Sequence, residues 1–89
     1  MDKKQLLSLR KNAHKLRPIV IIGTKGLTAS VHEEINLALN AHELIKIKIN
    51  AEDNSARASI IEEICTKHLA SKIQLIGHIV TIFRENQEV

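Results

Sequence analysis

The sequence predicts an α/β fold, a compact single domain in which a mixed four-stranded sheet packs with three helices. Segments with apolar residues at helical spacing alternate with short β-branched or alternating segments, in the order α-β-α-β-α-β-β. A glycine-containing dipeptide separates the last two apolar runs, which is typical of a β-hairpin. Because no linker or repeat divides the chain, we expect one domain over residues 1–89, with frayed ends at 1–2 and 85–89.

The first helix is expected over residues 3–16. Its apolar positions recur at spacings of three and four: Leu6, Leu9, Ala13 and Leu16. Pro18 disfavours the helical conformation at Arg17 and so marks the end of this helix. The following run, Ile-Val-Ile-Ile at 19–22, consists entirely of β-branched residues. Such a continuous run predicts a central strand that is covered on both faces.

A second helix follows a short glycine-containing segment. Either Thr28 or Ser30 can cap its first turn, and Ser30 with Glu33 matches the capping-box spacing. One stripe of this helix carries Val31, Ile35, Ala38, Leu39 and His42. The next strand, 44–49, alternates isoleucine with lysine, which predicts one buried face and one basic face. A right-handed crossover should place it parallel to strand 19–22.

A third helix is expected to end near residue 69. Its inward side is formed by Ile60, Ile61, Ile64, Cys65 and either His68 or Leu69. Two antiparallel strands, 72–76 and 79–83, complete the fold. The turn between them is Gly77-His78, and glycine in the first position of a two-residue turn favours type II′.

Composition indicates a cytoplasmic protein that folds without disulfide bonds. Hydrophobic residues make up 44% of the chain, and Cys65 has no partner cysteine. We find neither a signal peptide nor an apolar run of about 18 residues, and we expect no membrane association. Residues 1–26 carry seven basic side chains and one acidic, whereas residues 27–89 carry six basic and nine acidic. This asymmetry indicates either an anionic partner, such as nucleic acid, or a solvated basic helix.

The residue pattern gives no support to an enzyme or a metal site. The adjacent glutamates at 33–34 and 62–63 lie on helices, where neighbouring side chains diverge by about 100° and cannot act together as an acid–base pair. No serine or cysteine lies in a nucleophile-elbow motif. Cys65 and His68 share a helix face, but two ligands do not form a zinc site. We therefore expect no catalytic residue, metal, cofactor or small-molecule substrate.

The segment Gly23-Thr24-Lys25-Gly26, which joins the first strand to the second helix, is the main candidate site. It has the G-x-x-G spacing with which KH-type modules clamp an RNA backbone, because glycines let a sugar-phosphate chain approach closely. The helix that follows directs unpaired N–H groups and its positive dipole end to the same place, and Lys25 adds a cation. A plain strand-to-helix turn is the alternative, since the segment is neither a P-loop nor G-x-G-x-x-G.

Further basic residues widen the candidate surface. They are Lys4, Lys11, Lys15, Arg17, Lys46 and Lys48. The first three fall within about 40° of one another on the side of the first helix opposite its apolar stripe. The last two share one strand face, either as RNA contacts or as solvated sheet lysines. With no Trp or Tyr and one Phe, the chain would bind RNA through phosphates and 2′-hydroxyls rather than by base stacking.

The stretch AHKLRPIVIIGTKGLTASVHEEINLALNAHELIKIKI (13–49) resembles the signature of the CRM domain, the chloroplast RNA splicing and ribosome maturation module. It is most similar to the small bacterial members known as the YhbY family, and QLIGHIVTIFR (74–84) resembles their closing hairpin and arginine. The resemblance covers essentially the whole chain. Two departures are Phe83, where the family often has tyrosine, and Thr24-Lys25, where it often has a small or polar pair that includes asparagine.

The resemblance implies helices packed on a four-stranded sheet, similar to the C-terminal domain of a bacterial translation initiation factor. It also implies RNA binding, with ribosomal RNA in precursors of the large ribosomal subunit as the partner. The glycine loop, Lys46 and Arg84 match the family's motifs. We expect a non-enzymatic RNA-binding protein that assists ribosome assembly. A different RNA, such as an intron or a messenger, and an acidic protein partner are the alternatives.

Overall fold

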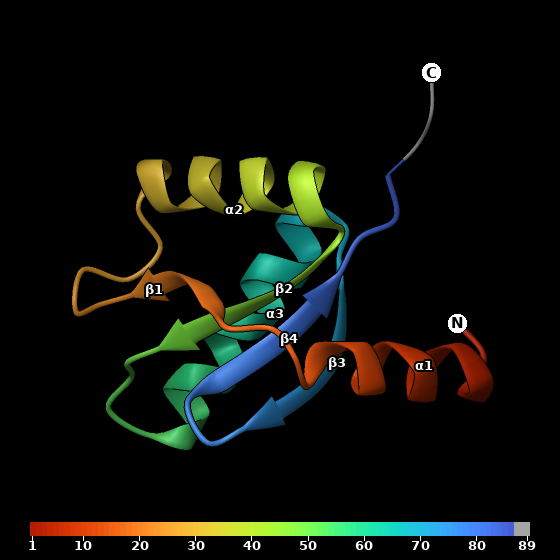
Figure 1. The fold of residues 1–89 in the computed structure, drawn as a ribbon. Helices are drawn as coiled ribbons and strands as arrows, with labels where there is room; N and C mark the ends of the chain where they lie inside the picture. Colours follow the sequence, from red (N-terminus) through yellow and green to blue (C-terminus); the bar gives the residue numbers. More distant parts are fainter. Residues whose placement is uncertain (87–89) are drawn as a thin grey trace.

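Four strands form one mixed sheet in the order β1-β2-β4-β3 in the computed structural model of the chain (Figure 1). The structure describes residues 1–86. The strands are β1 (Pro18–Ile22), β2 (Leu44–Ile49), β3 (Ser71–Ile76) and β4 (Ile79–Phe83). β1 pairs with β2 in parallel, and β4 pairs with both β2 and β3 in antiparallel fashion. The predicted fold class and element order are confirmed.

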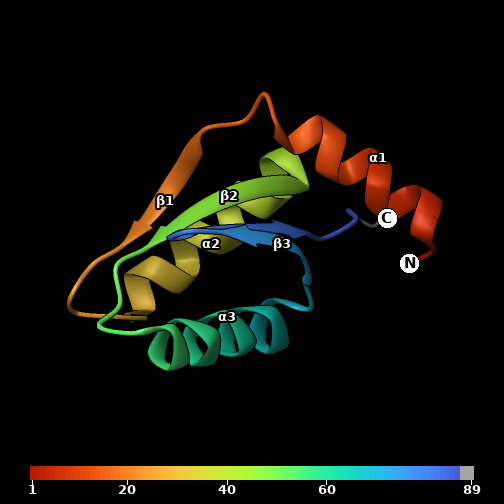
Figure 2. The ribbon, with the colours of Figure 1, turned by 90° about the horizontal axis from the view of Figure 1, so that it is seen from below.

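The helices α2 (Ala29–His42) and α3 (Asn54–His68) cover one face of the sheet, and α1 (Lys3–Ala13) lies on the other side (Figure 2). Figure 2 shows α3 and α1 on opposite sides of the sheet, with α1 displaced toward one end. α1 contacts β2 and β3, and Arg10 Nε donates a hydrogen bond to the carbonyl of Ile73 at 3.4 Å. The remainder of that sheet face is therefore not covered by a helix of the described chain.

The core lies between the sheet and the two helices α2 and α3. Alternate isoleucines of β2 point into it, as the period-two pattern predicts. The buried cluster consists of Val20, Ile22, Ile35, Leu39, Ile45, Ile47, Ile49, Ile61, Ile64, Val80 and Ile82. Each fully buried side chain of this kind contributes about 1.5–3 kcal/mol through the hydrophobic effect. This cluster therefore fixes the sheet and the two helices as one body.

Side-chain caps determine where the helices begin. Asp2 caps α1 and Asp53 caps α3, and each carboxylate accepts a hydrogen bond at 2.7 Å from the backbone N–H three residues later. Thr28, rather than Ser30, caps α2, because Thr28 Oγ1 accepts a hydrogen bond from the Val31 N–H at 3.2 Å. Each cap satisfies a donor that the first turn of a helix otherwise leaves unpaired.

The described parts of both termini make hydrogen bonds with the rest of the chain. Asp2 is a helix cap, and the Asn86 N–H donates to Glu43 Oε2 at 2.8 Å. The side-chain amide of Asn86 also donates to the Asn40 carbonyl at 2.8 Å. The expected fraying at 87–89 lies outside the described residues.

The prediction that the Ile-Val-Ile-Ile run forms a central strand is wrong, because β1 is an edge strand. Only Val20 and Ile22 enter the core, whereas Ile19 is 48% exposed and Ile21 is 62% exposed. β-branched residues favour an extended backbone whether or not they are buried, so the run does not distinguish a central strand from an edge. Pro18 at the start of β1 fits the edge position, where a missing N–H is tolerated.

The first helix ends three residues earlier than predicted, at Ala13. A turn closed by the Leu16 N–H, which donates to the Ala13 carbonyl at 3.0 Å, replaces the last helical turn. The chain must leave the helix before Pro18 in order to reach the sheet edge. As a consequence, Lys15 does not lie on the helix face that carries Lys4 and Lys11.

The bounds of the other elements agree with the predictions. At the end of α3 the structure selects His68 over Leu69 as the inward residue, whereas the placement of His42 differs from the prediction. His68 is buried, but Leu69 is 85% exposed and adopts a left-handed conformation (φ 53°) as the C-cap of α3. His42, which was expected on the buried stripe of α2, is exposed. In the hairpin, Gly77 has a φ of 60° and His78 has no positive φ, which fits the type II′ turn.

Candidate functional site

The glycine loop is a tight turn at the end of the edge strand β1. The Gly26 N–H donates to the Gly23 carbonyl at 3.0 Å, which leaves Thr24 and Lys25 at the two exposed corners. The Thr28 N–H in turn donates to the Gly26 carbonyl at 3.1 Å. These bonds hold the loop backbone directly before the first turn of α2.

The two glycines differ in what the fold requires of them. Gly26 has a φ of +69°, a conformation that residues with a Cβ rarely adopt, so the turn itself requires glycine there. Gly23 has no such φ, and a Cβ built on it has no heavy atom within 4 Å among the described residues beyond Gly23 and its two chain neighbours. Neither backbone conformation nor internal contacts therefore account for glycine at position 23.

The start of α2 places positive electrostatic potential beside the loop. Thr28 satisfies the Val31 N–H, whereas the N–H groups of Ala29 and Ser30, in the first turn of α2, donate to no carbonyl of the described chain and lie at the positive end of the helix dipole. Lys25 adds a mobile cation at the corner of the turn. This combination of backbone donors, dipole and cation is suited to binding phosphate groups.

A hollow of about 480 Å³ lies between the loop and the beginning of α3. Gly23, Thr24 and Gly26 form one wall, and Ala56 and Ile60 contribute to the other. Glu52 also lines this hollow, and its carboxylate disfavours a phosphate there. The outer side of the loop is therefore the side suited to an anion.

The uncovered face of the sheet continues from the loop. Lys48 pairs with Ile21 of β1, so its side chain shares the uncovered face with Ile21 and lies one residue pair before the end of both strands. Lys46 lies on the same face, opposite Thr81 of β4. The structure thus brings Lys48 next to the glycine loop, with Lys46 one step further along β2.

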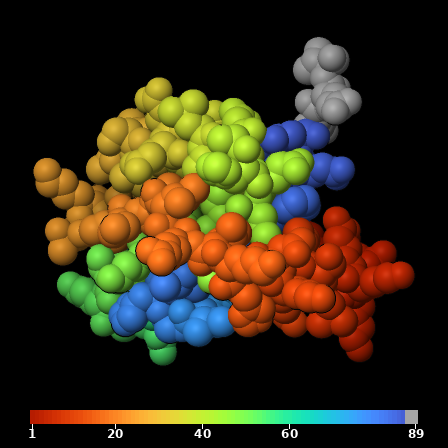
Figure 3. Space-filling model, in the orientation of Figure 1, coloured from red at the N-terminus to blue at the C-terminus, as the bar shows by residue number. Residues whose placement is uncertain are grey.

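The N-terminal cations form a second group at the other end of β1. Lys15 and Arg17 lie in the linker between α1 and β1, while Lys4 and Lys11 lie along α1. Figure 1 shows the glycine loop and α1 at opposite ends of the molecule. Figure 3 shows the linker, in orange, between α1 in red and α2 in yellow-green. The predicted residues therefore do not form one cluster around the loop.

Arg84 lies far from the loop and is engaged within the fold. Its guanidinium donates to the carbonyl of His68 at 3.2 Å, to the carbonyl and Oδ1 of Asn36 at 3.3 and 3.1 Å, and to Asn40 Oδ1 at 2.9 Å. It follows the end of β4, which pairs with the beginning of β2, whereas the loop adjoins the end of β2. Arg84 links the three elements at this end of the sheet.

Sequence reasoning missed a buried arginine near the loop end of the sheet. Arg57 is 5% exposed, and its terminal nitrogens lie 2.8 Å from Asn54 Oδ1 and 2.8 Å from His78 Nδ1. Its Nε is buried without a hydrogen-bond partner among the described residues. The contacts tie the hairpin turn to α3. No pattern in the sequence marks this arginine, because charged residues in helices are normally at the surface.

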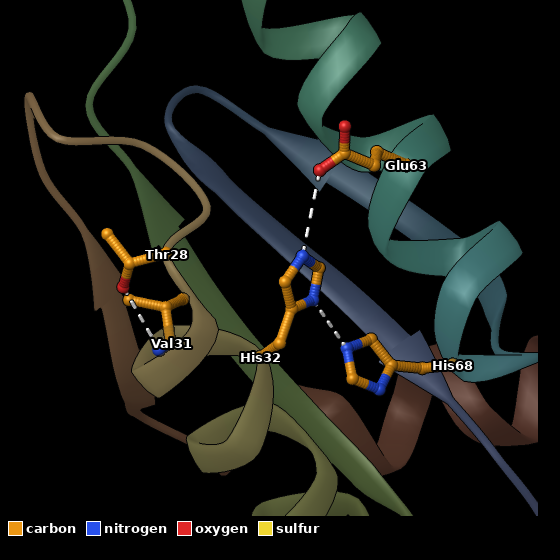
Figure 4. Close-up of polar contacts among 5 residues, drawn as sticks. All are labelled: Thr28, Val31, His32, Glu63 and His68. Carbon is orange, nitrogen blue, oxygen red and sulfur yellow. Dashed lines mark hydrogen bonds and ion pairs between the residues drawn. The ribbon is translucent and has the colours of Figure 1, made fainter.

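Two histidines that are distant in sequence also meet between α2 and α3 (Figure 4). His32 Nδ1 lies 2.9 Å from His68 Nε2, and His32 Nε2 lies 3.6 Å from a carboxylate oxygen of Glu63. Burial lowers the pKa of His68, and the positive charges of His32, Arg84 and Lys67 lower it further. The lowered pKa favours the neutral form of His68, which forms one hydrogen bond with His32.

Other chemistry in the described residues is limited. Burial raises the pKa of the Cys65 thiol, an effect that Lys72 partly opposes, so the thiol is less readily ionised than an exposed one. Within residues 1–86, no three His, Cys, Asp or Glu side chains are grouped so that they could hold a metal ion. None of the helices in that range has the length and apolar character needed to cross a membrane.

Comparison with known proteins identifies the family. The model of the CRS1/YhbY (CRM) domain matches residues 1–84. A Haemophilus influenzae protein named as an RNA-binding protein is 41% identical over 88 residues, which are 99% of this chain and 89% of the relative. A Pseudomonas aeruginosa protein named as a probable RNA-binding protein is 36% identical over 85 residues, covering 96% of this chain and 79% of the relative.

The fold agrees with that of a solved relative. The solution structure of a Staphylococcus aureus protein, described as a candidate RNA-binding protein, matches with a TM-score of 0.84 and 28% identity. The match covers 99% of this chain and 92% of the other. Sequence and structure therefore both show that this chain belongs to the CRS1/YhbY (CRM) domain family.

Proposed function

We propose that this protein binds RNA without catalysing a reaction, and that it binds ribosomal RNA in precursors of the large ribosomal subunit and assists their assembly. The names of the bacterial relatives support RNA as the partner. The resemblance to the YhbY family supports ribosomal RNA as the RNA that is bound and the cytoplasm as the location of the protein. The basic N-terminal third of the chain supports a polyanion as the ligand.

The observation that carries the proposal is the glycine at position 23. Its backbone conformation does not require glycine, and apart from Gly23 and its two chain neighbours no described residue has a heavy atom within 4 Å of a Cβ placed there. A sugar-phosphate backbone that approaches the loop from outside accounts for the missing side chain, since a Cβ would hold it away. We therefore assign the outer side of the loop to the RNA backbone, with Lys25 and Lys48 pairing with phosphates.

This mode of binding has a measurable character. Contacts to phosphates position a protein on RNA but carry no sequence information. We expect weak sequence preference and an affinity that falls steeply with salt, because each phosphate contact releases bound counterions.

The first test compares Gly23→Ala with the wild-type chain. The substitution meets no steric obstacle, so it should leave folding intact or stabilise the chain by about 0.4–1 kcal/mol. The Kd for a large-subunit ribosomal RNA fragment, measured by fluorescence anisotropy, should rise by about tenfold, or 1.4 kcal/mol. Ser71→Thr is the matched control, because it adds one methyl group at an exposed strand position remote from the loop. Equal affinities for all three proteins would overturn the assignment of the loop.

The second test addresses the ribosomal partner. In a lysate separated on a sucrose gradient, the tagged protein should sediment with large-subunit precursors and return to the top after nuclease treatment. The Gly23→Ala variant should be depleted from those fractions. Sedimentation that resists nuclease would point to an acidic protein partner. Crosslinking that recovers introns or messengers in place of ribosomal RNA would show a different RNA.

A further inference from the structure

A second concave site lies at the end of β1 opposite the glycine loop. A groove of about 510 Å³ runs between α1, the linker before β1, the start of β2 and the end of β4. The linker that lines it is drawn in orange in Figure 3. The volume of the groove is within the range of about 300–1,000 Å³ that holds ligands of nucleotide size.

The floor of this groove is apolar and its edge is basic. Leu9, Leu44 and Phe83 are on the floor, and Leu16 and Ile19 are 36% and 48% exposed beside them. Phe83 is the chain's only aromatic residue of the Phe, Tyr and Trp class. The edge carries Lys15, Arg17 and His42. Such a groove suits a ligand with a flat apolar body and an anionic flank.

The charges at the edge are available to a ligand. Neither Lys15 nor Arg17 lies within 4 Å of a carboxylate oxygen in residues 1–86. The single acid on the groove, Glu43, directs a carboxylate oxygen to the Asn86 N–H at 2.8 Å. The groove therefore presents a net positive edge to an anion.

The backbone at the groove is strained. Glu43 has φ 61° and ψ −50°, which residues with a side chain seldom adopt. Two hydrogen bonds hold it there: its N–H donates to the Leu39 carbonyl at 2.9 Å, and its carbonyl accepts from the Arg84 N–H at 3.0 Å. Strained residues that the surrounding structure holds in place are concentrated at ligand sites. The strain is independent of the groove's charge and shape.

The groove is continuous with the glycine loop along the uncovered sheet face. Ile19 lines the groove and Ile21 follows on the same face of β1, with Lys46 and Lys48 alongside on β2. The distance from Ile19 to Gly23 is about 13 Å at 3.3 Å per strand residue. One RNA segment can therefore contact both sites.

We propose that this groove receives one unpaired nucleotide of the bound RNA, with its base on Leu16, Ile19 and Phe83 and its phosphates on Lys15 and Arg17. The inference rests on the proposed RNA-binding function and adds a preference for RNA that contains an unpaired base. An unstacked base with an aromatic or apolar side chain beneath it is the common basis of recognition in single-stranded RNA. This proposal differs from the expectation that the chain recognises RNA through phosphates and hydroxyls alone.

The test uses two RNA hairpins that differ by one bulged nucleotide, with Kd measured by fluorescence anisotropy at constant salt. Wild-type protein should bind the bulged hairpin about fivefold more tightly, the low end of the range for stacking of one base. Leu16→Gln and, independently, Ile19→Thr should remove this preference. Leu37→Gln is the control, because Leu37 is similarly apolar and exposed but lies on α2 outside the groove. Thermal melting checks that each variant folds.

Each outcome has one meaning. Loss of the preference in both groove variants, with Leu37→Gln unchanged, supports the proposal. Equal binding of both hairpins by the wild-type chain overturns it, while the proposed function stands if Gly23→Ala still weakens both complexes. A preference that survives both groove variants also overturns it and leaves the groove for a protein partner. Absence of binding to either hairpin and to ribosomal RNA overturns the proposed function as well.

Discussion

Replacing Arg84 by glutamine is expected to lower the free energy of unfolding by about 2 kcal/mol and to leave the RNA affinity of the folded protein unchanged. The bond from its guanidinium to the partly buried His68 carbonyl contributes about 1.5 kcal/mol. The three bonds to Asn36 and Asn40 are exposed, so water replaces them and each contributes only about 0.3 kcal/mol. The charge at the end of α3 adds about 0.5 kcal/mol, and glutamine recovers part of the total.

The assay is urea unfolding followed by far-UV circular dichroism. In a separate thermal melt, the same loss of about 2 kcal/mol should lower the Tm by about 8–16 °C for a domain of this size. Lys67→Gln is the control, because it removes a charge from the same end of α3 and should cost about 0.5 kcal/mol or less. The reasoning is refuted if Arg84→Gln is no less stable than Lys67→Gln and binds RNA about tenfold more weakly. Arg84 would then be an RNA contact, as the family resemblance implies.

Three further predictions follow from the same structure. The folded-state pKa of His68 is below its unfolded value, so the stabilising contribution of His68 is complete above about pH 6.5 and is lost as the pH falls through the folded-state pKa. The urea concentration at the midpoint of unfolding should therefore be lower at about pH 5 than at about pH 7.5, and His68→Gln should reduce this difference. Leu69→Gly should raise the free energy of unfolding by about 0.5–1 kcal/mol, because Leu69 is an exposed C-cap residue in the left-handed conformation that glycine adopts without strain. A loss of stability in the same urea assay would mean that the Leu69 side chain makes a stabilising contact. Lys25→Ala should reduce the slope of log affinity against log salt by about one, measured by salt titration, whereas an unchanged slope would remove Lys25 from the phosphate contacts.

Periodicity predicted which residues of most elements face the core. The alternation in β2 placed Ile45, Ile47 and Ile49 correctly, because only one register puts all three on the helix-covered face. The same reasoning failed for β1, where Ile19 and Ile21 are exposed. Local patterns report on backbone preference, whereas the number of neighbours that a strand has depends on the order of strands in the sheet.

The candidate site was only partly accessible from sequence. The glycine spacing located the loop, and the structure shows that of its two glycines only Gly26 has a positive φ. The cations were predicted as one helix face, but the early end of α1 places Lys15 in the linker. The partners of Arg57 could not be predicted, because its contact with His78 joins residues 21 positions apart through the tertiary fold.

The position of β1 at the sheet margin also affects how the protein moves. β1 is held by one ladder of hydrogen bonds, to β2, whereas β4 is held by two. Half of the β1 amides point away from β2, and we expect these to exchange with deuterium far sooner than the amides of β4. A strand with one neighbour can separate locally while the remaining three strands stay assembled. The glycine loop is thus attached to one of the two edge strands, and we expect that it can adapt its position to an uneven surface without unfolding the domain.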